Sequence, residues 1–310
     1  DSIHSDIRVF PGPNGGFQMM GAEPDRNGVS RSVRLGEALH EGAQRLTPLP
    51  HAAPRLEAEL LLSEATGHAR PYLYSWPERL IDDSDYRRYR RLLQRRAGGE
   101  PIAYILGRQE FWSLELRVTP ATLIPRQDSE LLVERALALL PVDRPASLAD
   151  LGTGSGALAA ALARERPRWH IVATERSAQA LAVARDNFRR LELHHIETLL
   201  GNWLAPLAGR RFRCLLSNPP YIPESDPHLG LGDLRFEPRS ALAAGPDGLE
   251  AIRRIASEAR PCLEDQGLLL LEHGYDQGPG VRGLLRRQGY RRVESWRDLA
   301  GRERVSGGYR

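Results

Sequence analysis

From Ser147 onward, short apolar segments alternate with helical segments, and this alternation constrains the fold more than any other feature. Strands separated by helices indicate a parallel, doubly wound sheet with helices on both faces. Two further apolar segments, near 291–297 and 304–309, are close enough in sequence to form an antiparallel pair. We therefore expect an α/β fold. The five expected parallel strands are Leu148–Leu151, His170–Glu175, Ile196–Leu200, Phe212–Ser217 and Gly267–Glu272.

A glycine-rich turn joins the first expected strand to the first helix, where residues 150–156 read Asp-Leu-Gly-Thr-Gly-Ser-Gly. Gly152, Gly154 and Gly156 allow a tight turn and a close approach of the backbone to a ligand. Taken alone, the turn also fits a relaxed dinucleotide-binding pattern. Glu175 ends the second strand about twenty residues later, where a carboxylate can accept hydrogen bonds from both ribose hydroxyls of an adenosine. Together, the glycine-rich turn and Glu175 predict a cofactor that contains adenosine without a 2′-phosphate.

Trp203 follows the third expected strand. An indole at this position can line the adenine pocket. An ordinary half-buried tryptophan explains the same spacing equally well. The role of Trp203 therefore stays open on the spacing alone.

The tetrapeptide Asn218-Pro219-Pro220-Tyr221 follows the fourth expected strand. Two prolines end a strand and stiffen the backbone, so the amide of Asn218 lies on a rigid corner at the ligand-binding edge of the sheet. The Asn218 side-chain carbonyl and the Pro219 backbone carbonyl can accept hydrogen bonds from a planar nitrogen, and Tyr221 can pack on the flat group. With the glycine turn opposite, the motif predicts transfer of a methyl group to such a nitrogen, mainly by positioning. No general base is needed before transfer, because the alkylated nitrogen becomes acidic.

Composition fits a globular protein without membrane spans, because no run approaches the roughly 18 apolar residues of such a span. All 43 basic residues are arginines, yet the formal net charge is only +3. This charge permits contact with an RNA-bearing complex but does not argue for it. The two cysteines, Cys214 and Cys262, have no partners at metal spacing, which fits a reduced, cytoplasmic setting.

The chain divides into four expected parts. Residues 1–31 are predicted to be a flexible extension. Residues 32–107 carry leucines at helical spacing and are predicted to form a small helical bundle, whose arginine-rich third helix begins near the acidic run 82–85. Residues 108–126 are predicted to form a hairpin with a turn at Ser113 and an extended linker. Residues 127–310 form the expected methyltransferase domain.

These motifs resemble those of S-adenosylmethionine-dependent N-methyltransferases of the seven-stranded class. A second set of segments resembles the HemK/PrmC group, the release-factor glutamine N5-methyltransferases. The resemblance runs from about Leu35 to Arg310. The segments that carry it are Phe111–Leu114, Thr119–Arg126, Arg235–Pro238, Leu271–Gly274 and Glu303–Val305.

The resemblance implies a class I methyltransferase fold, a Rossmann-like seven-stranded sheet preceded by a small helical bundle. It implies S-adenosylmethionine as cofactor, S-adenosylhomocysteine as product, and the Gly-Gly-Gln glutamine of bacterial class I release factors as substrate. It further implies a cytoplasmic enzyme whose helical domain helps to bind the release factor, and we expect a monomer without direct nucleic-acid binding. The implied cofactor-binding residues are Gly152, Thr153, Gly154, Ser155, Gly156, Glu175, Trp203 and Asn218. The implied catalytic and substrate-binding residues are Asn218, Pro219, Pro220 and Tyr221.

Two positions depart from the family pattern. Gln127 replaces a common proline, and Asn202 replaces an aspartate, so we place Asn202 outside the site.

Three other functions compete with this assignment. A glutamine methyltransferase of a ribosomal protein would share the catalytic motif, but the 111–126 segment favours release factors. A DNA adenine methyltransferase would need a basic target-recognition domain. A non-catalytic module would gain nothing from keeping the glycine turn, Glu175 and Asn218 together.

Overall fold

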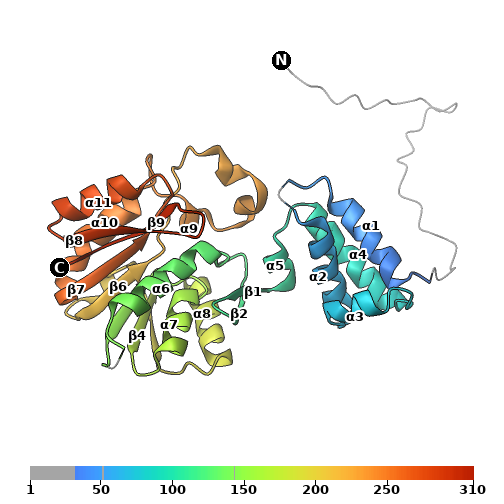
Figure 1. The fold of residues 1–310 in the computed structure, drawn as a ribbon, viewed down its shortest axis with the longest axis horizontal. Coiled ribbons are helices and arrows are strands. Elements are labelled where there is room, and N and C mark those ends of the chain that lie inside the picture. Colours follow the sequence, from blue (N-terminus) through green and yellow to red (C-terminus); the bar gives the residue numbers. More distant parts are fainter. Residues whose placement is uncertain (1–31, 51, 143) are drawn as a thin grey trace, which may run out of the picture.

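The computed structural model describes residues 32–50, 52–142 and 144–310, and the extension expected over 1–31 lies outside them. A helical part and a larger part built on a sheet lie side by side, joined by a short hairpin (Figure 1). No helix in the described ranges is both long and apolar enough to cross a membrane. The helical part contains α1 (Leu35–Leu46), α2 (Pro54–Thr66), α3 (Arg70–Ser75), α4 (Asp83–Ala97) and α5 (Ile102–Leu106).

Seven strands form the large sheet in the order β5-β4-β3-β6-β7-β9-β8. The first five run parallel, whereas β9 is antiparallel to both β7 and β8. The seven strands and the antiparallel pair at the end of the chain are confirmed. The strands are β3 (Ser147–Leu151), β4 (His170–Glu175), β5 (Ile196–Leu200), β6 (Phe212–Ser217), β7 (Leu263–Glu272), β8 (Arg291–Arg297) and β9 (Glu303–Tyr309).

Helices cover both faces of the sheet. Neighbouring residues of each strand point to opposite faces, so each strand packs against helices on both sides. Leu148 of β3 packs in one apolar cluster with α6, α7 and α8, while Ala149 packs in another with α10 and α11. Strands buried on both faces read as nearly continuous apolar runs, which is the pattern seen here. The covering helices are α6 (Glu130–Leu139), α7 (Ala157–Glu165), α8 (Ala178–Arg190), α10 (Glu250–Ala259) and α11 (Gly278–Arg287).

Several elements differ from the sequence-based expectation, among them the short helix α3, which makes the expected third helix α4. The fifth parallel strand begins at Leu263 rather than at Gly267. Helix α11 was not predicted, because the Gly-Pro-Gly at its start is a combination typical of turns, although a proline is favoured in a first helical turn. In α4 the expected acidic start is confirmed, but Asp82 makes no capping hydrogen bond with its side chain.

The predicted hairpin is confirmed as β1 (Arg108–Phe111) and β2 (Leu114–Arg117). Its two turn residues, Trp112 and Ser113, have φ angles of 52° and 57°. Positive φ at both central residues matches the right-handed twist of the flanking strands. Glu130, the first residue of α6, accepts a hydrogen bond from the Trp112 backbone at 2.9 Å and fixes the hairpin on the sheet domain.

A loop excursion over residues 223–243 leaves the sheet domain after β6 and reaches the helical part (Figure 1). Its neck is closed by hydrogen bonds of Ile222 to Leu242 at 2.9 Å and of Ala244 to Ile222 at 3.0 Å. It carries three short helices, η3 (Pro227–Gly230), η4 (Gly232–Phe236) and α9 (Arg239–Leu242). On the helical side, Arg235 donates to the carbonyl of Gly98 at 2.8 Å.

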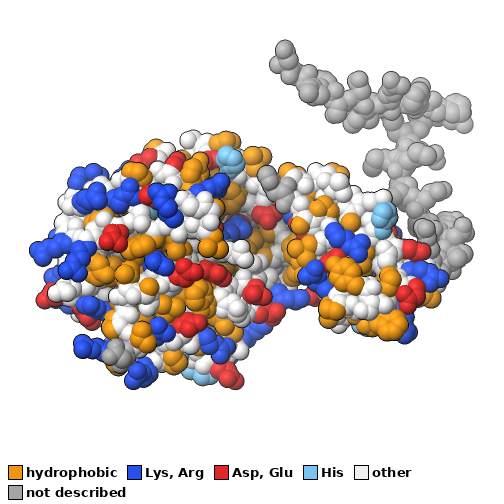
Figure 2. All heavy atoms as spheres, in the orientation of Figure 1, with side chains coloured by type: hydrophobic (Ala, Val, Ile, Leu, Met, Phe, Trp, Pro, Cys, Tyr) orange, Lys and Arg blue, Asp and Glu red, His pale blue; other side chains and the backbone are white. Residues whose placement is uncertain are grey.

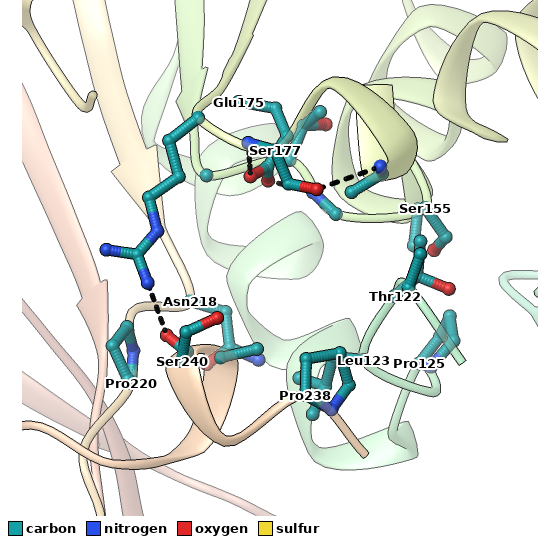
Figure 3. Close-up of a pocket in the computed structure, with 18 of the residues that line it drawn as sticks. Thr122, Leu123, Pro125, Ser155, Glu175, Ser177, Asn218, Pro220, Pro238 and Ser240 are labelled. Atoms are coloured by element: carbon teal, nitrogen blue, oxygen red, sulfur yellow. Dashed lines mark hydrogen bonds between the residues drawn. The ribbon is translucent and has the colours of Figure 1, made fainter. Parts of the chain in front are cut away.

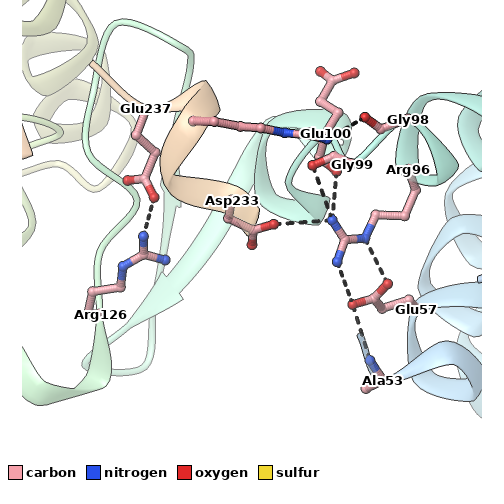
Figure 4. Close-up of polar contacts among 10 residues, drawn as sticks. Ala53, Glu57, Arg96, Gly98, Gly99, Glu100, Arg126, Asp233 and Glu237 are labelled. Atoms are coloured by element: carbon pink, nitrogen blue, oxygen red, sulfur yellow. Dashed lines mark hydrogen bonds and ion pairs between the residues drawn. The ribbon is translucent and has the colours of Figure 1, made fainter. Parts of the chain in front are cut away.

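Arg96 at the end of α4 is the centre of the contact between the two parts (Figure 4). Its guanidinium is 7% exposed and pairs with Glu57 of α2 at 2.8 Å. The same group reaches Asp233 of the excursion at 3.2 Å and the carbonyl of Glu100 at 3.1 Å. Arg96 therefore has two roles. Its pair with Glu57 stabilises the helical part, and its pair with the more exposed Asp233 joins that part to the excursion.

Substitutions of Arg96 and of Asp233 separate the two roles of this contact. In Arg96→Gln the Glu57 carboxylate, whose side chain is only 12% exposed, loses its partner, so we expect the free energy of unfolding to fall by about 3 kcal/mol. In Asp233→Asn the lost partner is 42% exposed, and the expected fall is below about 1 kcal/mol. Urea denaturation of both variants measures the difference, and equal losses would contradict this division of roles.

Candidate active site

A cavity of about 280 Å³ lies at the carboxyl ends of β3, β4 and β6. The turn after β3, Glu175 at the end of β4, and Asn218 after β6 all contribute to its wall (Figure 3). These residues meet because parallel strands in an open sheet place their carboxyl ends on the same edge. The cavity is therefore where the sequence predicts a ligand.

The glycine turn is shaped by two neighbours that leave no room for side chains. A Cβ on Gly152, which has a φ of 76°, would lie 2.8 Å from the ring of Trp203. A Cβ on Gly156, at a φ of 86°, would lie 2.6 Å from the Phe188 ring on α8. Gly152 thus lets the indole lie against the turn beside the cavity, while Gly156 lets α7 pack on α8.

The Glu175 carboxylate closes the turn from the β4 side. It accepts a hydrogen bond from the Gly154 backbone at 3.0 Å and a second one from the Ser177 backbone at 2.9 Å. Its side chain is thereby fixed at the cavity wall, as Figure 3 shows. A carboxylate held at this place can accept hydrogen bonds from vicinal hydroxyls of a ligand.

Asp150 is buried beneath the same turn and is 1% exposed. Thr153 donates to its Oδ2 at 2.6 Å, while Oδ1 has no hydrogen-bond partner among the described residues. Burial raises the pKa of Asp150 from its ordinary value of 3.8 to about 7, although the Thr153 hydroxyl works in the opposite direction. The turn therefore rests on a carboxyl group that titrates near neutral pH.

The Asn218 side chain is oriented by Ser129. Its Nδ2 donates to the Ser129 hydroxyl at 3.0 Å, which leaves Oδ1 without a donor among the described residues. Directly before it, Ser217 donates to the Leu151 carbonyl at 2.6 Å and ties the ends of β6 and β3 together. The free carbonyl oxygen of Asn218 can therefore accept a hydrogen bond from a ligand in the cavity.

The remaining residues of the tetrapeptide take different positions. Pro220 lines the cavity, whereas Pro219 and Tyr221 lie outside the cavity wall. The Tyr221 hydroxyl donates to Glu272 Oε1 at 3.2 Å, and burial raises its pKa. The ring of Tyr221 packs against the apolar cluster that contains α10 and α11.

The structure thus brings most of the predicted site residues to one cavity. Gly156, Pro219 and Tyr221 adjoin this set without lining the cavity. Those that line it are Gly152, Thr153, Gly154, Ser155, Glu175, Trp203, Asn218 and Pro220.

Asn202, which the sequence analysis left outside the site, also lines the cavity. Its Oδ1 atom is buried and has no hydrogen-bond partner within the described ranges. A buried carbonyl oxygen without a donor is costly unless a ligand supplies one. Asn202 is therefore placed to accept a hydrogen bond from an amino group of the ligand.

Two walls of the cavity were not predicted, the linker over 120–125 and the end of the excursion over 238–241. Glu237 joins them, because it accepts from the Ile124 backbone at 3.0 Å and pairs with Arg126. Ser240 accepts a hydrogen bond from Arg176 at 3.4 Å (Figure 3). Both walls lie in or next to segments that carry the family resemblance, and this was the signal that could have found them.

The arrangement has two functional sides. One side offers a glycine turn, a fixed carboxylate and an indole, which suit a nucleoside. The other side offers an oriented amide oxygen on a rigid proline corner, which suits a polar N–H group. A group can therefore be passed between two ligands that meet in the cavity.

Comparison with known proteins agrees with this geometry. Residues 37–107 match the family model of the PrmC N-terminal domain, and residues 127–233 match that of the methyltransferase small domain. The release factor glutamine methyltransferase of Pseudomonas aeruginosa is 54% identical over 81% of this chain and 91% of that protein. The one of Escherichia coli K12 is 47% identical over 82% of this chain and 91% of that protein.

Solved structures share the fold at low sequence identity. The hMettl16 catalytic domain, crystallised with the MAT2A 3′UTR hairpin 1, aligns with a TM-score of 0.53. The alignment covers 70% of this chain and 80% of that one, at 15% identity. This likeness supports the methyltransferase fold of the sheet domain.

The titration of Asp150 predicts a pH dependence of stability. Because burial raises the pKa of Asp150 in the folded state, the contribution of this carboxyl group to stability is fully present below pH 3.8 and is lost as the pH rises through about 7. We therefore expect the stability of the native protein relative to Asp150→Asn to fall between pH 5 and pH 8, measured by urea denaturation.

Glu59→Gln is the control for this experiment. Although burial works in the opposite direction, hydrogen bonds from Tyr74, Arg70 and Arg55 lower the pKa of Glu59 below 4.5, so its contribution to stability is complete above that pH and is lost only as the pH falls. The stability difference for Glu59→Gln should stay constant between pH 5 and pH 8. A constant difference for Asp150→Asn as well would contradict the raised pKa.

Proposed function

The chain belongs to the family of release factor glutamine methyltransferases, and from this membership we propose that it methylates a glutamine of bacterial class I release factors. The acceptor is N5 of the glutamine in their Gly-Gly-Gln loop. The observation that carries the proposal is the two-sided cavity, in which Asn218 lies across from the glycine turn and Glu175.

The residues on the nucleoside side of the cavity fit S-adenosylmethionine. Glu175 would accept hydrogen bonds from the ribose hydroxyls, and the Trp203 ring would pack on the adenine. The buried Oδ1 of Asn202, which has no donor among the described residues, would accept from the adenine amino group. When bound, this cofactor supplies a methyl group on a sulfonium, and S-adenosylhomocysteine is the product.

Asn218 and Pro219 would hold the substrate amide. An amide nitrogen is a poor nucleophile, because its lone pair is delocalised into the carbonyl group. Acceptors on its N–H bonds fix its orientation and favour the positive charge that develops on nitrogen. The Asn218 Oδ1 and the Pro219 backbone carbonyl would be these acceptors, and Ser129 holds Asn218 in the required orientation.

Rigid positioning accounts for the rest of the proposed mechanism. Pro219 and Pro220 restrict the backbone behind Asn218, so the acceptor does not move away as the reaction proceeds. Tyr221, also assigned to the site, would act by fixing the end of this corner through Glu272. The alkylated nitrogen loses its proton to water after transfer, so no dedicated base is required.

We propose further that the helical domain over 32–107 helps to bind the release factor, with the hairpin and linker over 108–126 leading to the catalytic domain over 127–310. We expect no direct nucleic-acid contact, because arginines and carboxylates are interspersed over the face shown in Figure 2 rather than gathered by sign. We also expect the enzyme to act as a monomer in the cytoplasm, where release factors function.

A DNA adenine methyltransferase and a ribosomal-protein methyltransferase would use the same asparagine motif. The relatives named as release factor glutamine methyltransferases, matched over more than four fifths of the chain, favour the release factor. A docking module without activity is disfavoured because Glu175, Asn202 and Asn218 are all directed to one cavity.

A labelling experiment tests the substrate. The protein is incubated with S-adenosylmethionine labelled in the methyl group and a class I release factor, beside a release factor whose loop glutamine is replaced by alanine. We expect label in the first and none in the second. Equal labelling of both, or of neither, would overturn the proposed function.

Asn218→Ala tests the acceptor. Removing one oriented polar group that acts in the transition state costs about 10²–10³ in kcat, and we expect a loss of at least that size. Thermal unfolding of the same variant serves as the fold control and should change little, because Asn218 is only half-buried. Undiminished turnover would contradict the role of Asn218.

Glu175→Gln tests the cofactor side. Hydrogen bonds to a charged group contribute about 1.5–3 kcal/mol, so we expect the dissociation constant for S-adenosylmethionine to rise about 10- to 100-fold. Calorimetric titration measures it, with Glu197→Gln as a control whose carboxylate pairs with Arg210 outside the cavity. An unchanged affinity in Glu175→Gln would contradict the assignment.

A further inference from the structure

One buried carboxylate joins the linker wall and the excursion wall of the cavity. The Glu237 side chain has no exposed surface, and its Oε2 accepts a hydrogen bond from the Ile124 backbone at 3.0 Å. Its Oε1 pairs with the guanidinium of Arg126. The chain neighbours Leu123 of the linker and Pro238 of the excursion line the cavity, where Figure 3 shows both. Glu237 therefore sets how the two walls lie against each other.

The linker that Glu237 holds also leads to the residue that orients Asn218. The Ser129 backbone donates a hydrogen bond to the Arg126 carbonyl at 3.1 Å, in the short helix η1 (Gln127–Ser129). The Ser129 hydroxyl in turn accepts from Asn218 Nδ2 at 3.0 Å. A continuous series of contacts therefore leads from Arg126, which Glu237 holds, to the Asn218 amide.

The two donors at Glu237 require a carboxylate. Each of its oxygens faces one donor, and a carboxylate accepts with both oxygens. An amide has one accepting oxygen and one donating nitrogen, so it would turn an N–H group toward either the Ile124 backbone or Arg126. The carboxylate therefore holds both points of the linker at once.

The charge of Glu237 is costly to bury, which favours a role in positioning over one in stability. Burial raises the pKa of Glu237 above 4.5, while the charge of Arg126 acts in the opposite direction and favours the ionised form. Apolar side chains would join the same two walls without burying a charge. They would not fix a direction, however, as two hydrogen bonds to one carboxylate do.

We propose that Glu237 is a positioning residue for methyl transfer, which holds the linker against the excursion so that Ser129 keeps the Asn218 amide in its reacting orientation. The inference rests on the proposed function, because the orientation of Asn218 matters only if its Oδ1 accepts a hydrogen bond from the substrate amide. The nucleoside side does not depend on this contact, since backbone groups beside the cavity hold the Glu175 carboxylate.

Glu237→Gln tests the role with almost no change in shape. The new amide cannot accept from both donors, so the linker, and Ser129 with it, should move relative to Asn218. A displacement of about 1 Å near the reacting atoms can cost about 10²-fold in rate, and we expect kcat on the release factor to fall about 10- to 100-fold. Calorimetric titration should give a dissociation constant for S-adenosylmethionine within about threefold of the native value.

Two variants of Arg126 test the other half of the contact. Arg126→Lys keeps a charged donor for Glu237 and should retain kcat within about threefold. Arg126→Met removes the donor and should lower kcat as Glu237→Gln does. In the double variant of Glu237→Gln and Arg126→Met the two losses should not multiply, because both act through one contact.

Glu303→Gln is the matched control in the same domain. Glu303 of β9 also faces two donors, Arg282 at 2.7 Å and Arg297 at 3.3 Å, and its side chain is 17% exposed. It does not line the cavity. Glu303→Gln should lower the midpoint of thermal unfolding and leave kcat unchanged.

Nuclear magnetic resonance of the Asn218 side-chain amide gives a readout without a release factor. Its signals are assigned by their loss in Asn218→Ala. They should shift in Glu237→Gln and in Arg126→Met, because Ser129 moves, and they should stay unchanged in Glu303→Gln.

The outcomes separate this inference from the proposed function. Absence of release factor methylation by the native enzyme would overturn the proposed function alone. Native kcat or unchanged Asn218 signals in Glu237→Gln, or losses that multiply in the double variant, would overturn the role of Glu237. A loss of cofactor affinity as large as the loss of kcat would overturn it as well, because the whole cavity would then have changed. If Glu237→Gln does not fold, native kcat in Arg126→Met is the result that overturns the role.

Discussion

The parallel sheet brings four groups at or near the candidate site to one edge. The strands β3, β4, β6 and β7 end at this edge with the glycine turn, Glu175, Asn218 and Glu272. None of these groups is near the others in sequence, and only the parallel order of the strands brings them together. The main contribution of the fold to chemistry is therefore one cavity whose wall is built from several strand ends.

This convergence has an energetic cost. Asp150 and Glu272 are both almost fully buried, and burial raises the pKa of each to about 7. Each also keeps one carboxyl oxygen without a partner among the described residues. Apolar packing on both faces of the sheet offsets this cost. Two costly buried carboxyl groups thus lie in strands that end at the edge of the sheet where the cavity is.

Much of the site could be predicted from sequence, because the informative residues directly follow strands whose apolar runs are easy to recognise. Glu175 and Asn218 are examples. Ser129 could not be predicted, since 89 positions separate it from Asn218 and a serine before a helix normally indicates a cap. The orientation of the Tyr221 side chain could not be predicted either. Two prolines stiffen a corner but do not determine to which side the next side chain turns.

The excursion over 223–243 connects the helical part with the cavity through two joints of unequal strength. At the cavity, the fully buried carboxylate of Glu237 holds the linker through Ile124 and Arg126. At the helical part, Asp233 is 42% exposed where it meets Arg96, and exposed ion pairs contribute little. The excursion is therefore fixed more strongly to the cavity than to the helical part through these two joints.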